Sequence, residues 1–208
     1  MKDEQEYIKD IAAIRTIMER TTKFKLLAGW AGIMAGIYAL AGVLIVKQYF
    51  RFNPGETEDM YITGGTIAMN TLNVIILAKC ILILSVGTAI YLSSRKAKQT
   101  GEKLWNATTK RLLMDMAIPL LAGGFLMLIL LSKGYFGFMA PLSLIFYGLA
   151  LYNAGKFTYD ELKILGFIQI GLGLVSIYFV QYGLLFWALG FGFAHILYGI
   201  YLHYKYER

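Results

Sequence analysis

Charged residues, cysteines and histidines are scarce in this sequence. Only 16% of its 208 residues are charged, against about 25% in an average soluble domain, which argues against both a disordered chain and a soluble domain. A single cysteine excludes an intramolecular disulfide framework and a multi-cysteine metal site. The two histidines, His195 and His203, lie on one predicted helix, so they cannot hold one haem from opposite sides within a subunit.

Motifs of common catalytic sites are missing as well. The sequence has no H-E-x-x-H, no G-x-S-x-G and no phosphate-binding glycine loop. We therefore expect no metal and no cofactor. An enzyme that acts on a lipid is the least favoured of the functional hypotheses.

Long hydrophobic runs, in contrast, are abundant, since 58% of the residues are hydrophobic. Six runs approach the roughly 20 residues that a helix needs to cross the ~30 Å hydrocarbon core. They lie near residues 26–46, 72–92, 112–131, 135–153, 162–180 and 183–202. The sequence predicts an all-α polytopic membrane protein with six transmembrane helices in residues 26–204, followed by a short cytoplasmic tail at 205–208.

The basic residues predict the orientation of these helices. When the runs alternate in direction, 16 of the 20 lysines and arginines fall on one side of the membrane and three on the other. The positive-inside rule then places both termini in the cytoplasm, as in a multi-pass protein of the bacterial inner (cytoplasmic) membrane. We interpret the net charge of +7 as a result of this topology. The expected partner is the lipid bilayer and not nucleic acid.

The even-numbered runs have similar endings. Gly87, Gly148 and Gly199 are each followed within four residues by a tyrosine. Three tandem helical hairpins would produce this pattern, and so would the convergence of membrane helices on similar inner ends.

Residues 1–25 predict an amphipathic helix on the cytoplasmic side. Tyr7, Ile11, Ile14 and Met18 recur at the spacing of one helical face, and the charged residues lie largely elsewhere. This face would lie on the membrane surface, pack on the protein's own inner loops, or dock on a cytoplasmic protein partner.

The outer part of the second run contains the first candidate ligand-binding residues. Lys79 lies within this predicted span, and Asn70 and Asn73 lie on its outer side. Ionisable residues in a membrane are costly. The lysine therefore either reaches outward to the headgroups or meets an anionic substrate or lipid group.

Gln169 and His195 are the second candidate because their predicted depths match. Each shares a helical face with two glycines, which are Gly166, Gly173, Gly192 and Gly199. Small residues mark close helix contacts in membranes, so we predict that the fifth and sixth spans pack through these glycines and bring the two side chains together. The pair would be an interhelical hydrogen bond or a proton-responsive or ligand-binding site, since histidine titrates near physiological pH.

Gly32 and Gly36 have the spacing of a close-packing motif in the first span. They would join this span to another one, or join two copies of the chain in a homo-oligomer.

Three stretches carry a resemblance to a family. The stretch from Ile14 to Phe24, IRTIMERTTKF, precedes the glycine-rich run LLAGWAGIMAGIYAL, and GFGFAHILYG lies in the sixth span. Together they resemble a family of uncharacterised six-span membrane proteins of Bacteroidota type. The resemblance implies a six-span fold without an assigned activity. Family members often accompany a winged-helix regulator, which implies a signalling role.

Two functional hypotheses follow. A small transporter or channel-like protein for a small polar or anionic solute would use Lys79 and the Gln169–His195 pair, and the sequence favours it. The alternative is a membrane sensor or regulatory subunit that signals through the N-terminal helix. A polar cavity that reaches Lys79 would favour transport, and a glycine-packed interior would favour the sensor.

Overall fold

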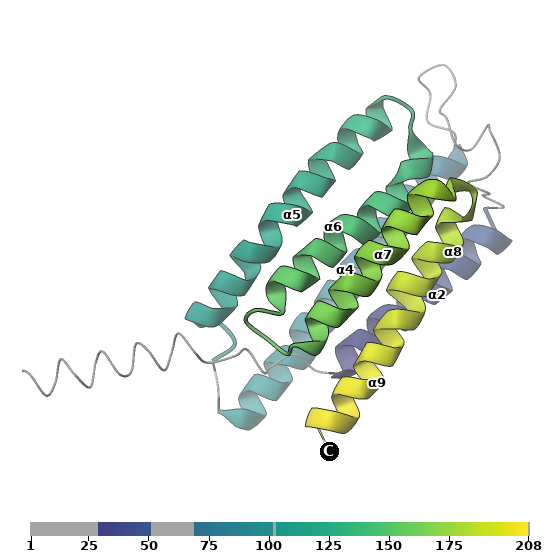
Figure 1. Ribbon diagram of the computed structural model, residues 1–208. Coiled ribbons are helices and arrows are strands. Elements are labelled where there is room, and N and C mark those ends of the chain that lie inside the picture. Colours follow the sequence, from purple (N-terminus) through teal and green to yellow (C-terminus); the bar gives the residue numbers. More distant parts are fainter. Residues whose placement is uncertain (1–28, 51–68, 102, 208) are drawn as a thin grey trace, which may run out of the picture.

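The chain folds into a bundle of helices. The computed structural model describes residues 29–50, 69–101 and 103–207. In these ranges every regular element is a helix, and six helices are long and apolar enough to cross a membrane (Figure 1). The predicted all-α, six-span fold is therefore confirmed. The predicted N-terminal helix, with Tyr7, Ile11, Ile14 and Met18, lies outside the described residues.

The six spans follow one another along the chain. The first five are α2 (Gly29–Gln48), α4 (Met69–Thr100), α5 (Ala107–Ser132), α6 (Met139–Ala154) and α7 (Glu161–Tyr178). The sixth is composed of α8 (Gly183–Trp187), a π-helical segment η4 (Ala188–Ala194) and α9 (His195–Tyr206). Two short 3-10 turns, η2 (Phe136–Phe138) and η3 (Val180–Tyr182), lead into α6 and α8.

Helix α4 is longer than the predicted second span at 72–92. It has 32 residues, which corresponds to about 48 Å at 1.5 Å per residue, whereas the hydrocarbon core is about 30 Å thick. The polar sequence after residue 92 contains no proline or glycine before Gly101, so the helix continues beyond the apolar run.

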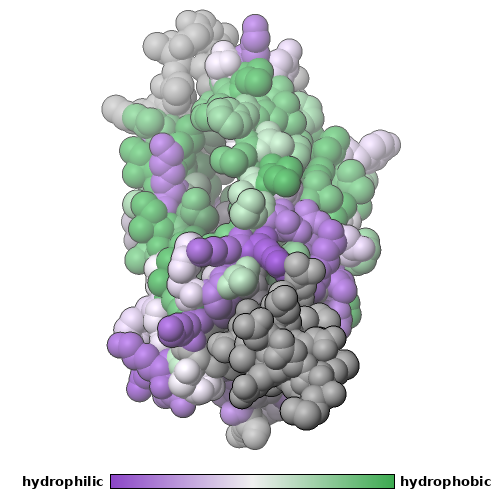
Figure 2. All heavy atoms as spheres, turned by 90° about the vertical axis from the view of Figure 1, so that its left-hand side faces the viewer, coloured by the Kyte–Doolittle hydropathy of each residue, from purple (hydrophilic) through white to green (hydrophobic). Residues whose placement is uncertain are grey.

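The surface of the bundle separates into an apolar and a polar zone. Figure 2 shows hydrophobic residues mainly over the upper part of this face and hydrophilic residues gathered from its middle toward the lower end. At this lower end α4 and α9 end and α5 begins (Figure 1). Large apolar side chains are widely exposed, including Leu44 at 66%, Ile83 at 70% and Ile118 at 72%. Hydrocarbon is the solvent that suits such a surface, so the fold is that of a helical membrane protein.

Glycines let neighbouring helices approach backbone to backbone. A Cβ atom on Gly148 of α6 would lie 2.7 Å from the carbonyl oxygen of Gly166 on α7. A Cβ atom on Gly199 of α9 would lie 2.6 Å from the backbone nitrogen of Ile33 on α2. Such contacts are open only to glycine, as expected of membrane helices that pack through small residues.

The predicted glycine contact between the fifth and sixth spans is wrong. Gly166 and Gly173 of α7 face α6, and Gly192 and Gly199 of the sixth span face α2. Equal depth in the membrane does not determine which face of a helix meets which neighbour. The glycine face of α7 instead packs on α6, and the glycine face of the sixth span packs on α2.

Gly32 and Gly36 pack within the chain. A Cβ atom on Gly32 would lie 3.2 Å from the Cα atom of Gly199, and one on Gly36 would lie 2.6 Å from the carbonyl oxygen of Gly192. The motif therefore joins α2 to the sixth span within the chain.

Candidate functional site

Buried side chains from three helices meet in the middle of the bundle. Gln169 on α7 has no exposed surface, and His195 at the start of α9 is 5% exposed. Gln169 Nε2 lies 3.3 Å from His195 Nδ1, so the structure brings the predicted pair together. The hydroxyl of Tyr147 on α6 lies 3.0 Å from His195 Nε2. We call these three side chains and the carbonyl group of Gly190 the central polar cluster.

The carbonyl oxygen of Gly190 is the shared acceptor of this cluster. It accepts hydrogen bonds from Gln169 Nε2 at 2.8 Å and from His195 Nδ1 at 2.9 Å. Gly190 lies in η4, where the wider π-helical turn departs from regular α-helical hydrogen bonding. A Cβ atom at this position would collide with Gln169 Oε1 and with the side chain of Leu144. The cluster therefore requires a glycine at this position.

The partners of His195 define its tautomer. A carbonyl oxygen can only accept, so Nδ1 carries the hydrogen and donates it to Gly190. Nε2 is then the acceptor and receives the hydrogen of the Tyr147 hydroxyl. Both ring nitrogens of the neutral imidazole are satisfied in this arrangement.

Aromatic rings line one side of the imidazole. The ring of Phe191 stacks on that of His195 at 5.8 Å between centroids with 13° between planes, and Tyr147 stacks at 5.5 Å. Trp187 continues the stack, 4.9 Å from Phe191. We did not predict Tyr147, Phe191 or Trp187 from the sequence. A signal for two of them was present, because Trp187, Phe191 and His195 recur every four residues on one helical face.

Two side-chain atoms on fully buried residues of α7 have no hydrogen-bond partner among the described residues. They are Oε1 of Gln169 and Oγ of Ser176, and neither residue has exposed surface. The amide of Gln169 thus uses its nitrogen in the cluster and leaves its oxygen unpaired. Buried polar atoms of this kind are rare in proteins and mark places where water or a small polar molecule binds.

The structure does not bring the other candidate residues to this cluster. Lys79 is exposed and Asn73 is partly exposed on α4, and the side chain of Asn70 lies outside the described residues. Helix α4 packs mainly against α2, where Ile81 contacts Gly42 and the Tyr38 and Thr88 hydroxyls lie 3.3 Å apart.

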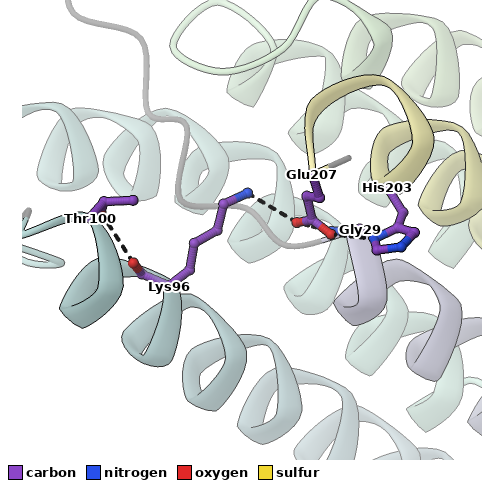
Figure 3. Close-up of polar contacts among 5 residues, drawn as sticks. All are labelled: Gly29, Lys96, Thr100, His203 and Glu207. Carbon is purple, nitrogen blue, oxygen red and sulfur yellow. Dashed lines mark hydrogen bonds and ion pairs between the residues drawn. The ribbon is translucent and has the colours of Figure 1, made fainter.

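A charged cluster joins three helices at the polar end of the bundle (Figure 3). Glu207 accepts hydrogen bonds from Lys96 Nζ on α4 at 3.0 Å and from the backbone N–H of Gly29, the first described residue of α2, at 3.0 Å. His203 Nδ1 donates to its other oxygen at 2.8 Å. Burial opposes the ionisation of Glu207, but hydrogen bonds from His203, Lys96 and Gly29 outweigh it and lower the pKa of this carboxyl group.

The fold defines the class of this chain, a six-span α-helical membrane protein. Comparisons with protein-family models, curated proteins and solved structures find no match to it. Its membership of the six-span family that it resembles therefore stays a prediction.

Proposed function

We propose that this chain is a sensor or regulatory subunit of the inner membrane, with both termini in the cytoplasm, and that the central polar cluster is its proton-responsive element. One observation carries the proposal: a buried imidazole has both nitrogens engaged at a π-helical turn, and this turn packs directly on α2. Helix α2 follows the N-terminal segment, so it connects the cluster to the part of the chain predicted to meet a partner.

Protonation of His195 would upset the balance of donors and acceptors in the cluster. A second hydrogen on Nε2 forces the Tyr147 hydroxyl to accept, and its own hydrogen then needs a new partner. The imidazolium would also be a buried charge, and no carboxylate in the described ranges forms a hydrogen bond with it. The Phe191 and Tyr147 rings supply part of the compensation through cation–π contact. The rest must come from rearrangement, because a buried charge without a counter-charge is costly.

The π-helical turn gives this rearrangement a place to occur. Short π-helical segments are less regular than α-helix and are often found at functional sites. Rewinding of η4 would move the Gly190 carbonyl group away from Gln169 and His195. Because Gly36 of α2 contacts the backbone of Gly192, with no side chain between them to absorb a shift, α2 would move with η4.

Transport of a small polar or anionic solute is the second candidate function. The unpaired atoms Gln169 Oε1 and Ser176 Oγ favour it, since they offer polar contacts inside the bundle. The close glycine contacts around them favour the sensor instead. In the transport case, liposomes that contain the protein would swell faster in glycerol than empty liposomes.

Histidine NMR tests the proposed function directly, because the chain has only two histidines. Protein labelled with ¹⁵N-histidine in nanodiscs gives two imidazoles, and His203→Gln identifies the signals of His195. We expect His195 to be protonated on Nδ1 alone near pH 8 and to take up a second proton between about pH 8 and pH 5. Backbone deuterium exchange in η4 and α2 should rise over the same pH interval.

The two histidine variants provide matched controls. His195→Gln should abolish the pH-dependent rise in deuterium exchange, and His203→Gln should leave it in place. A His195 that stays neutral down to about pH 5 would refute the proton-responsive role, and so would exchange in η4 that does not depend on pH.

A further inference from the structure

A second set of buried polar groups lies between the central polar cluster and the polar end of the bundle. Oε1 of Glu161, in the first turn of α7, accepts hydrogen bonds from Lys205 Nζ and from the Tyr206 hydroxyl, the latter at 3.0 Å. Oε2 of Glu161 is buried and has no hydrogen-bond partner among the described residues. Lys205 is 45% exposed, so this ion pair is open to water on one side.

Tyr198 lies on α9, between His195 and Lys205 in the sequence. It follows His195 by three residues on α9, and residues at this spacing share a helical face. Its hydroxyl group is buried and has no hydrogen-bond partner within the described part of the chain. Tyr198 and Tyr147 pack against the same core cluster, which includes Leu162, the residue next to Glu161. Buried polar atoms in this situation are normally satisfied by internal water.

We propose that Glu161, Tyr198 and Tyr147, bridged by internal water, form a proton path from the polar end of the bundle to His195. Each end of the path is anchored by a direct contact, since Tyr147 bonds to His195 Nε2 at 3.0 Å and Glu161 bonds to exposed Lys205. The charge distribution predicts that this end faces the cytoplasm. The inference rests on the proposed function, because the path matters only when His195 takes up a proton.

The transfer balances without any other reactant. A proton from bulk water arrives through internal water at the buried carboxylate oxygen Oε2 of Glu161, and then passes through water to the Tyr198 hydroxyl. Each hydroxyl accepts a proton on a lone pair and releases its own, so the hydroxyl of Tyr147 delivers a proton to His195 Nε2. One proton has moved to His195, and Glu161 and both tyrosines return to their starting states. The titratable groups that face the path are Tyr147 from α6, Glu161 from α7, Tyr159 from the α6–α7 connection, and Tyr206 and Lys205 from α9.

The rate at which His195 gains and loses its proton tests the path. In the ¹⁵N spectra, the line shapes of the His195 signals near their titration midpoint report exchange between the neutral and protonated forms. Tyr198→Phe keeps the ring and removes the hydroxyl group. We expect this variant to slow the exchange by about tenfold or more while the protonated fraction at each pH stays the same.

Two further variants make the result specific. Tyr204→Phe is the matched control, because Tyr204 lies on the same helix and is 60% exposed. Glu161→Gln preserves side-chain shape and should slow the exchange as Tyr198→Phe does, so the path can be tested even when Tyr198→Phe does not fold.

The outcomes separate the path from the proposed function. Exchange in Tyr198→Phe or Glu161→Gln that is as fast as in Tyr204→Phe would overturn the path and leave the proton-responsive role standing. A wild-type His195 that takes up no proton would overturn the proposed function, and the path with it.

Discussion

Replacing Gly199 by alanine would strain the contact between the first and last spans. The added Cβ atom would lie 2.6 Å from the backbone nitrogen of Ile33 and 2.5 Å from the carbonyl oxygen of Gly29, whereas ordinary contacts are 3.4–4 Å long. Both neighbours are backbone atoms, so no side chain can turn away. Relief requires α2 and α9 to separate by about 1 Å, and overpacking of this kind costs about 1–3 kcal/mol.

Alanine also has a favourable effect that reduces this loss. It stabilises the interior of a helix by about 0.8–1 kcal/mol relative to glycine in water. The expected net change in Gly199→Ala is therefore a decrease of up to about 2 kcal/mol in the free energy of unfolding.

Gly171→Ala is the matched control. Gly171 lies within α7, is exposed, and has no atom within 4 Å of an added Cβ. The same substitution there should leave the free energy of unfolding unchanged or raise it by up to about 1 kcal/mol. Equilibrium unfolding in mixed micelles of a mild detergent and dodecyl sulfate, followed by circular dichroism, compares the two variants. Equal stability of Gly199→Ala and Gly171→Ala would refute the tight backbone contact.

Two further predictions concern charged residues. Lys79→Met should change insertion and the free energy of unfolding by less than about 0.5 kcal/mol, because Lys79 is exposed; a large loss in a pulse-labelling and unfolding assay would show that the lysine has a structural partner. Glu207→Gln should lower the free energy of unfolding by about 1–3 kcal/mol near pH 7, because charged hydrogen bonds from Lys96 and Gly29 are weakened. The pKa of Glu207 is lower in the folded protein than in the unfolded chain, so its contribution is complete above the unfolded pKa and disappears as the pH falls through the folded value. The difference between wild type and Glu207→Gln should therefore shrink on acidification below about pH 4, and a difference independent of pH would contradict this assignment.

The six spans and one pair of site residues could be predicted from the sequence. Hydrophobic runs of near-membrane length are a local property, so they indicate the helices without knowledge of the packing. The meeting of Gln169 and His195 could be predicted because helices have a fixed rise per residue, and two residues at equal depth in antiparallel spans lie at the same level.

The packing partners of each helix face were decided only in the tertiary structure. Gly166 and Gly199 were expected to join the fifth and sixth spans but pack on α6 and α2, because six helices compete for every close-packing face at once. Tyr147 joins His195 from a third helix, and the Glu207 cluster joins residues from α2, α4 and the end of the chain. The spacing of residues within one helix does not show which residues of other helices will contact them.

The sequence by itself determined that the chain is a helical membrane protein with six spans, because hydrophobicity, length and periodicity are properties of single segments. The tertiary structure alone decided that His195 lies at a π-helical turn, bonded to Tyr147 and Gly190 and packed through that turn onto α2. The physical reason is that hydrogen bonds and close backbone contacts between spans depend on the rotation of each helix about its axis. That rotation is fixed by all neighbours together.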